Sequence, residues 1–100
     1  MDFDMENYHY TKKVFSLLLL THDFSLEREQ DISNEGKEAH YQSYNHSLII
    51  GCSREEGVYI KIWLQSSWKT LHAQSYKDQS SFVEKIKAME QDAERILLDS

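Results

Sequence analysis

Hydrophobic and polar residues alternate between residues 45 and 74, and this alternation predicts three antiparallel strands. A loop at 53–57 fixes the register of the first two strands. The predicted cross-strand pairs are Cys52 with Val58, Ile50 with Ile60, and Leu48 with Ile62. A tight turn at Ser66 and Ser67 then pairs Ile62 with Leu71 and Ile60 with Ala73. This face of the sheet is predicted to form the core.

The opposite face of the same strands is unusually aromatic. It is predicted to carry Ser47, Ile49, Tyr59, Lys61, Trp63, Thr70 and His72. Gly51 lies opposite Tyr59, where the missing side chain makes room for the aromatic ring. Because Tyr and Trp are enriched at interfaces, we interpret this face as a binding surface. The alternatives are that a loop or the first helix covers Tyr59 and Trp63, or that the face holds a small ligand.

Residues 5–21 are predicted to form a helix, because the four leucines at 17–20 favour helix over strand. A strand at 14–20 is the alternative. The apolar stripe of the helix comprises Tyr8, Thr11, Phe15, Leu18 and Leu19. A signal peptide is not expected, because the preceding residues are acidic and Thr21-His22-Asp23 offers no small-residue cleavage site.

Residues 24–32 alternate and are followed by Asn34-Glu35-Gly36, which predicts a hairpin with a return strand from about residue 38. Pairing across this loop sets Leu26 opposite Tyr44 and Phe24 opposite His46. Toward its tip both faces are polar, so we expect an arm that projects from the body. One face carries Arg28, Gln30, His40 and Gln42, and the other carries Glu27, Glu29, Asp31 and Ser43.

The last element is predicted to be an amphipathic helix that begins with a capping box of Ser81 and Glu84. Its apolar stripe comprises Phe82, Ile86, Met89, Ala93 and Ile96. The expected fold is therefore a single α+β domain over residues 1–100, with a four-stranded antiparallel meander in the order α-β-β-β-β-α. Both helices are expected on the face that bears Val58, Ile60, Ile62 and Leu64.

Charge narrows the classes of partner. The chain of 100 residues has a formal net charge of −6, which disfavours nucleic acid and anionic membranes and suits a protein with a basic surface. The single cysteine, Cys52, faces the predicted core and is interpreted as a buried apolar side chain in a reducing compartment. We expect a cytoplasmic protein.

Enzymatic chemistry has little support in the sequence. The five histidines show none of the spacings typical of metal ligands, and the three glycines are isolated rather than grouped in a phosphate-binding loop. Glu55 and Glu56 are neighbours in a hairpin loop, where carboxylates are usually solvated and point apart. We therefore expect no catalytic residues, no metal and no cofactor.

The sequence favours a non-enzymatic acidic protein that acts by binding another protein. The predicted partner-binding residues are Tyr59, Lys61, Trp63, His72, Glu27, Glu29 and Asp31. In size, charge and element order the chain resembles small acidic inhibitors of phages and bacteria, including toxin-immunity and anti-defence proteins. It is also similar to the opening portion of acidic, dimeric secretion chaperones. The alternatives are a nucleic-acid-binding module that uses the aromatic face, and a chaperone-like adaptor that dimerises through it.

Overall fold

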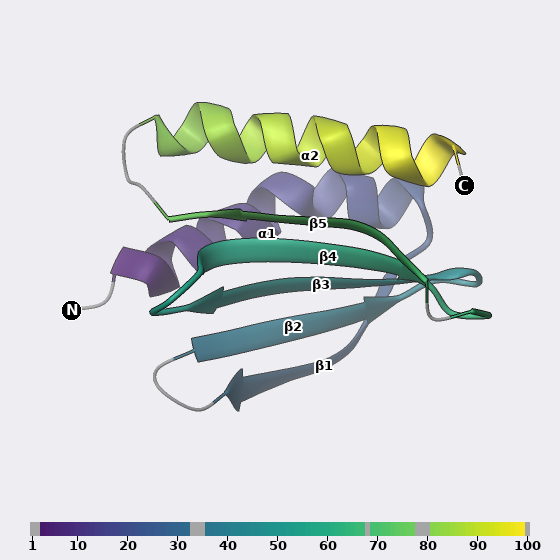
Figure 1. Ribbon diagram of the computed structural model, residues 1–100, viewed down its shortest axis with the longest axis horizontal. Coiled ribbons are helices and arrows are strands. Elements are labelled where there is room, and N and C mark those ends of the chain that lie inside the picture. The colour runs from purple at the N-terminus through teal and green to yellow at the C-terminus, as the bar shows by residue number, and fades with distance from the viewer. Residues whose placement is uncertain (1–2, 33–35, 68, 78–80, 100) are drawn as a thin grey trace.

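One antiparallel sheet and two helices make up the described part of the chain, residues 3–32, 36–67, 69–77 and 81–99 of a computed structural model. The elements are α1 (Phe3–Thr21), β1 (Ser25–Ile32), β2 (Gly36–Gln42), β3 (His46–Ser53), β4 (Gly57–Leu64), β5 (Thr70–Tyr76) and α2 (Phe82–Asp99). The strands lie in the order β1-β2-β3-β4-β5 (Figure 1). The predicted α+β class is confirmed, but the predicted count of four strands is wrong because the sheet has five.

Helix α1 is confirmed, and the alternative of a strand at 14–20 is wrong. All five residues of its predicted stripe are buried. The helix ends in a Schellman motif: the Phe24 N–H donates to the Leu19 carbonyl at 2.8 Å, and the Asp23 N–H donates to the Leu20 carbonyl at 3.2 Å. Asp23 has a φ of 60°, which is the left-handed conformation that this motif requires. The chain thus turns directly from α1 into β1.

The extra strand arises from a turn at residues 43–45 that separates β2 from β3. The Ser43 N–H donates to the His46 carbonyl at 2.9 Å, and the Gln65 amide nitrogen donates to the carbonyls of both residues, at 2.9 and 3.0 Å. Tyr44 is 95% exposed in this turn. Leu26 therefore pairs with Tyr41 rather than with Tyr44, and the predicted pairing of Phe24 with His46 is wrong as well.

The expected projecting arm is also wrong, because β2 lies inside the sheet between β1 and β3 (Figure 1). Ala39 and Tyr41 of β2 are buried in the core. Only β1 is exposed along nearly its whole length, as an edge strand. A register shift between Leu26 and Arg28 leaves Glu27 without a cross-strand partner.

The predicted register of β3 and β4 is confirmed at all three pairs. Between β4 and β5 the predicted register holds only where Trp63 pairs with Thr70. A register shift follows, so Ile62 pairs with His72 and Ile60 with Gln74. Leu71 is the extra residue of this bulge. The predicted pairing of Ile60 with Ala73 is therefore wrong by one residue.

Both helices lie on one side of the sheet. In Figure 1, α1 crosses behind β3 and β4, while α2 runs along β5 and packs against α1. The Tyr10 and Phe82 rings lie 6.0 Å apart, and His22 Nε2 lies 2.7 Å from Glu94 Oε2. Twelve residues separate the two contacts on each helix, so α1 and α2 run side by side and parallel.

The predicted stripe of α2 is nearly right. Ile86, Met89 and Ala93 are buried, but Leu97 rather than Ile96 is the fourth buried residue. The predicted capping box is not the geometry observed at the start of α2. Ser81 has a φ of 57° instead of the extended conformation of an N-cap, and its carbonyl accepts the Lys85 N–H at 3.0 Å.

Replacing Ile60 tests this one-sided core. Ile60 is fully buried beneath the helices, so Ile60→Asp would bury a carboxylate without a partner at a cost of several kcal/mol, against a total stability of about 5–15 kcal/mol. We expect the variant to unfold in thermal denaturation followed by circular dichroism. The matched control is Ala73→Asp, which places the same charge on the exposed side of β5 and should retain a cooperative transition. A parent-like transition for Ile60→Asp would contradict the described core.

Candidate functional site

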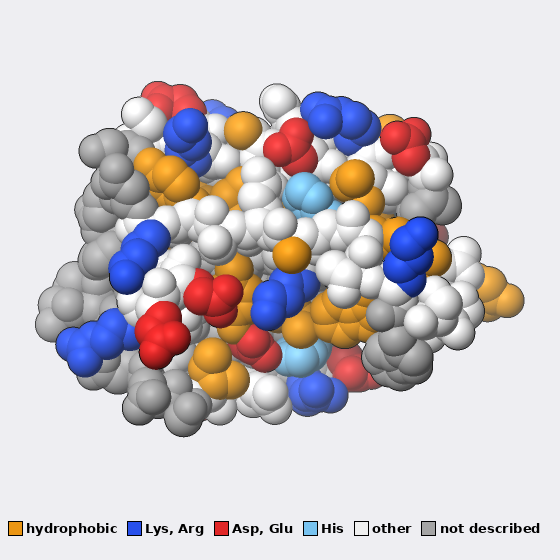
Figure 2. Space-filling view, viewed as in Figure 1, with side chains coloured by type: hydrophobic (Ala, Val, Ile, Leu, Met, Phe, Trp, Pro, Cys, Tyr) orange, Lys and Arg blue, Asp and Glu red, His pale blue; other side chains and the backbone are white. Residues whose placement is uncertain are grey.

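None of the described elements covers the side of the sheet away from the helices, and we call this side the open face. Strand alternation and the cross-strand pairs place on it Arg28, Gln30, Glu38, His40, Gln42, Ser47, Ile49, Gly51, Tyr59, Lys61, Trp63, Thr70, Ala73 and Ser75. Figure 2 looks onto this face and shows apolar side chains at its centre between scattered acidic and basic groups. The predicted placement of Tyr59, Lys61 and Trp63 on one face is therefore confirmed.

A hydrogen-bonded row crosses three strands at one end of the open face. Glu38 of β2, Gly51 of β3 and Tyr59 of β4 are consecutive cross-strand neighbours. The Tyr59 hydroxyl donates to Glu38 Oε2, and His40 Nε2 donates to Glu38 Oε1 at 3.0 Å. A single carboxylate thus ties β2 to β4 across the intervening strand.

Gly51 is what allows this row to form. A Cβ built at Gly51 would lie 2.5 Å from Tyr59 Cζ, which is closer than real Cβ contacts come. The Tyr59 ring therefore lies directly over the glycine, as the sequence predicted. Although it is on the open face, Tyr59 is only 2% exposed. It is buried without being covered by a helix.

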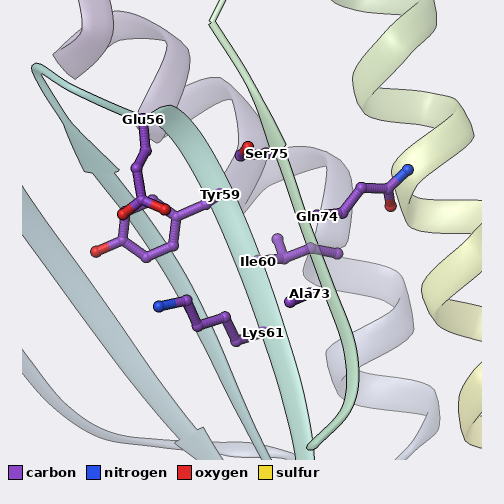
Figure 3. Close-up of a pocket in the computed structure, with 7 residues that line it drawn as sticks. All are labelled: Glu56, Tyr59, Ile60, Lys61, Ala73, Gln74 and Ser75. Carbon is purple, nitrogen blue, oxygen red and sulfur yellow. The ribbon is translucent and has the colours of Figure 1, made fainter.

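Lys61 and Glu56 border the Tyr59 ring. The Lys61 ammonium lies 5.1 Å from the ring centroid, within the range of a cation–π interaction. Both residues line a hollow of about 130 Å³ beside the ring (Figure 3). Burial raises the pKa of the Tyr59 hydroxyl, and the hydrogen bond to Glu38 raises it further. The phenol therefore stays protonated and acts as a donor.

A second hollow, of about 170 Å³, lies at the other end of the open face. Its open-face lining comprises Glu27, Arg28, His40, Gln42, Ser47, Ile49 and Trp63. Trp63 pairs with Ser47, so the indole stands beside a small side chain. The Trp63 Nε1 atom is buried and has no hydrogen-bond acceptor among the described residues. Such an unsatisfied donor costs about 1–3 kcal/mol.

Four of the seven predicted partner-binding residues lie on or beside the open face: Tyr59, Lys61 and Trp63 of β4, and Glu27, which lines the hollow beside Trp63. His72 does not, because the bulge at Leu71 turns it to the helix side, where its Nε2 lies 2.9 Å from the Gln74 side-chain oxygen. Its predicted placement on the aromatic face is wrong. Ala73 occupies the open-face position that was predicted for His72.

The three predicted acidic residues do not all lie on one face. Glu29 faces α1, where it accepts hydrogen bonds from Tyr8 at 2.5 Å and Lys12 at 2.6 Å. These bonds, the Lys12 bond most strongly, hold the pKa of Glu29 below its usual range. Asp31 faces the same side and lies 3.8 Å from Lys37 Nζ. Glu29 and Asp31 therefore share a face, as predicted, but Glu27 lines the open-face hollow, so the prediction that all three lie on one face is wrong.

The roles of Glu38 and His40 could not be predicted from the sequence. The alternation had placed His40 with Arg28 and Gln42 on one face, and this grouping is confirmed. The sequence did not predict the turn at 43–45. Without this turn β2 and β3 form a single strand, so Glu38 is not placed beside Gly51 and Tyr59. The available indication of this site was the pairing of Gly51 with Tyr59.

Among the residues that the structure describes, no group of three or more His, Cys, Asp or Glu side chains could hold a metal ion. Neither described helix is both long and apolar enough to cross a membrane. Cys52 is buried in the core cluster, in agreement with its predicted structural role.

Comparison with known proteins gives no relative. No protein-family model, curated protein or solved structure matches the chain.

The raised pKa of Tyr59 predicts a loss of stability at high pH. In the unfolded chain a tyrosine ionises near pH 10, whereas in the folded chain Tyr59 resists ionisation, so its contribution is present below about pH 10 and falls as the pH rises further. We expect urea unfolding between about pH 9 and 11 to show a shallower pH dependence for Tyr59→Phe, by up to about 1.4 kcal/mol per pH unit. Tyr44→Phe, at the exposed turn, is the control and should keep the parent slope. Equal slopes for all three proteins would contradict the buried Tyr59 site.

Proposed function

We propose that this chain is a non-enzymatic binding domain of the inhibitor, immunity or anti-defence type. Its open face binds a partner protein, and the partner presents a basic surface to it. The observation that carries the proposal is a sheet face that no described element covers, on which the half-buried Trp63 borders a hollow. Tyr59 and Ile49 lie on the same face but are only 2% and 8% exposed. An antiparallel sheet can face water on one side, but that side is normally polar. Aromatic residues at the centre of a polar rim are typical of interface anchors.

The acidic charge of the chain supports a partner with a basic surface. The chain has a net charge of −6, and Glu27, Glu38 and Glu56 lie on or beside the open face. Long-range attraction between such a surface and a basic protein speeds association. Two basic residues, Arg28 and Lys61, also line the hollows of this face, too few to favour a phosphate backbone.

The nucleic-acid alternative has one observation in its favour, which is that sheet aromatics can stack on unpaired bases. Tyr59, however, is nearly fully buried against Gly51, so the ring is not free to stack. Dimerisation through the open face would also cover Trp63 and is the third outcome to be tested. The nucleic-acid alternative predicts bound RNA or single-stranded DNA, and the dimer alternative predicts a second copy of the chain. One series of variants therefore distinguishes these two alternatives.

The first experiment compares Trp63→Ala with Leu98→Ala, which removes an exposed apolar side chain from α2 on the other side of the molecule. Proteins retained by the wild-type chain are identified, purified and measured directly by calorimetry. A partner that supports the proposal binds through a basic surface, loses about 30-fold in affinity to Trp63→Ala, or about 2 kcal/mol, and is unaffected by Leu98→Ala.

Three outcomes contradict the proposal. A partner that binds Trp63→Ala as tightly as wild type would place the interface elsewhere. Micromolar binding of short RNA or single-stranded DNA would support the nucleic-acid alternative. A wild-type dimer in solution that Trp63→Ala converts to a monomer would assign the open face to a second copy of the chain.

The second experiment uses charge. Glu27→Gln combined with Glu56→Gln removes two acidic groups from the border of the open face and should slow association with the basic partner, most at low salt, with less effect on dissociation. Glu29 is left unchanged because it is bound to Tyr8 and Lys12 on the other side. The control, Glu84→Gln with Asp99→Asn, removes two charges from α2. A faster rate for the open-face variant would indicate a partner of negative charge, and equal rates for variant and control would exclude local steering.

A further inference from the structure

The middle strand of the sheet carries two small residues on its open face, and their surroundings differ. Gly51 and Ser47 lie on either side of Ile49 along β3. Over Gly51 the space is filled by the Tyr59 ring. Over Ser47 the corresponding space is the 170 Å³ hollow, with Trp63 at its border. The chain thus fills one position with its own aromatic side chain and leaves the other open.

The size of this hollow limits what can enter it. Small-molecule sites usually enclose about 300–1,000 Å³, so a hollow of about 170 Å³ suits a single side chain. Its lining combines the aromatic Trp63 and the apolar Ile49 with three oxygen acceptors, on Glu27, Gln42 and Ser47. An occupant that matches this lining has an apolar stem, a flat face and several donors.

We propose that the hollow beside Trp63 binds an arginine side chain of the basic partner protein. This inference rests on the proposed function and names the residue of the partner that is recognised. The guanidinium group is planar and carries five donors, and it stacks on aromatic faces while its methylene stem packs on apolar surface. The same face already shows the chemistry once, where the Lys61 ammonium lies 5.1 Å from the centroid of the Tyr59 ring.

Arg28 and His40 are the basic residues that line the hollow, and the permanent charge of Arg28 determines the sign of one test. Arg28 Nη1 lies 3.3 Å from Glu27 Oε1, and the two side chains are 54% and 43% exposed. Exposed ion pairs of this kind are weak, so an incoming guanidinium can replace Arg28 as the partner of Glu27. Arg28 nevertheless repels a cation. Its removal should therefore strengthen arginine binding, whereas it would weaken the binding of an anion.

The experiment titrates the isotopically labelled full chain with three blocked single residues: N-acetyl-arginine methylamide, the citrulline analogue of similar shape without charge, and the glutamate analogue. The signal is the indole N–H resonance of Trp63, assigned by its loss in Trp63→Phe. We expect saturable shifts with the arginine probe, at least about threefold tighter than with citrulline. Glu27→Gln should weaken arginine binding, Arg28→Gln should tighten it, and the control Glu55→Gln, in the β3–β4 loop, should leave it unchanged.

Filling the hollow gives an independent check. Ser47→Leu should abolish the shift of the Trp63 resonance, and if this variant fails to fold, the Glu27 and Arg28 variants still decide the outcome. Equal binding of citrulline, tighter binding of glutamate, or the absence of a saturable shift would overturn the inference. A protein partner that depends on Trp63 while the arginine probe does not bind would leave the proposed function standing. Arginine binding without any partner that depends on Trp63 would overturn the proposed function instead.

Discussion

The packing of both helices on one side of a five-stranded sheet is the constraint on which the rest of the molecule depends. The buried stripe of α1 meets the inward residues of β3 and β4, and α2 closes this layer along β5. The hydrophobic contacts of the helices therefore stabilise one face of the sheet only. The other face has to be stabilised by its own side chains, and the row of Glu38, Gly51 and Tyr59 does this at one end of it.

The predictable elements were those whose residues contact near neighbours in the sequence. The stripe of α1 and the register of β3 with β4 follow from a period of 3.6 or 2 and a short loop. The turn at 43–45 has neither glycine nor proline. Its carbonyls are satisfied by Gln65, which lies 22 residues from Ser43 in the sequence. The turn also has a local contact, in which Ser43 Oγ accepts the His46 N–H at 3.2 Å, but serine is a weaker turn signal than glycine or proline.

The candidate site was predictable to the extent that it lies on one uninterrupted strand. Tyr59, Lys61 and Trp63 alternate along β4, so their common face followed from the pattern. His72 and Glu27 each lie beside a register shift, and a shift of one residue exchanges the two faces of a strand. Glu29 and Asp31 keep the common face that the alternation predicted, but this face lies toward α1, where Tyr8 and Lys12 donate hydrogen bonds to Glu29.

The position of α2 along β5 has a consequence for the order in which the chain can fold. Each strand of the meander pairs with the strand made just before it, so the sheet can grow as the chain is synthesised. Helix α2 follows all of them, and its contact between Glu94 and His22 spans 72 residues. Until α2 docks, the inner side of β5 has no cover, and exposed apolar surface of this kind invites association with other chains. Nascent protein is therefore most prone to aggregate in the interval between completion of β5 and docking of α2.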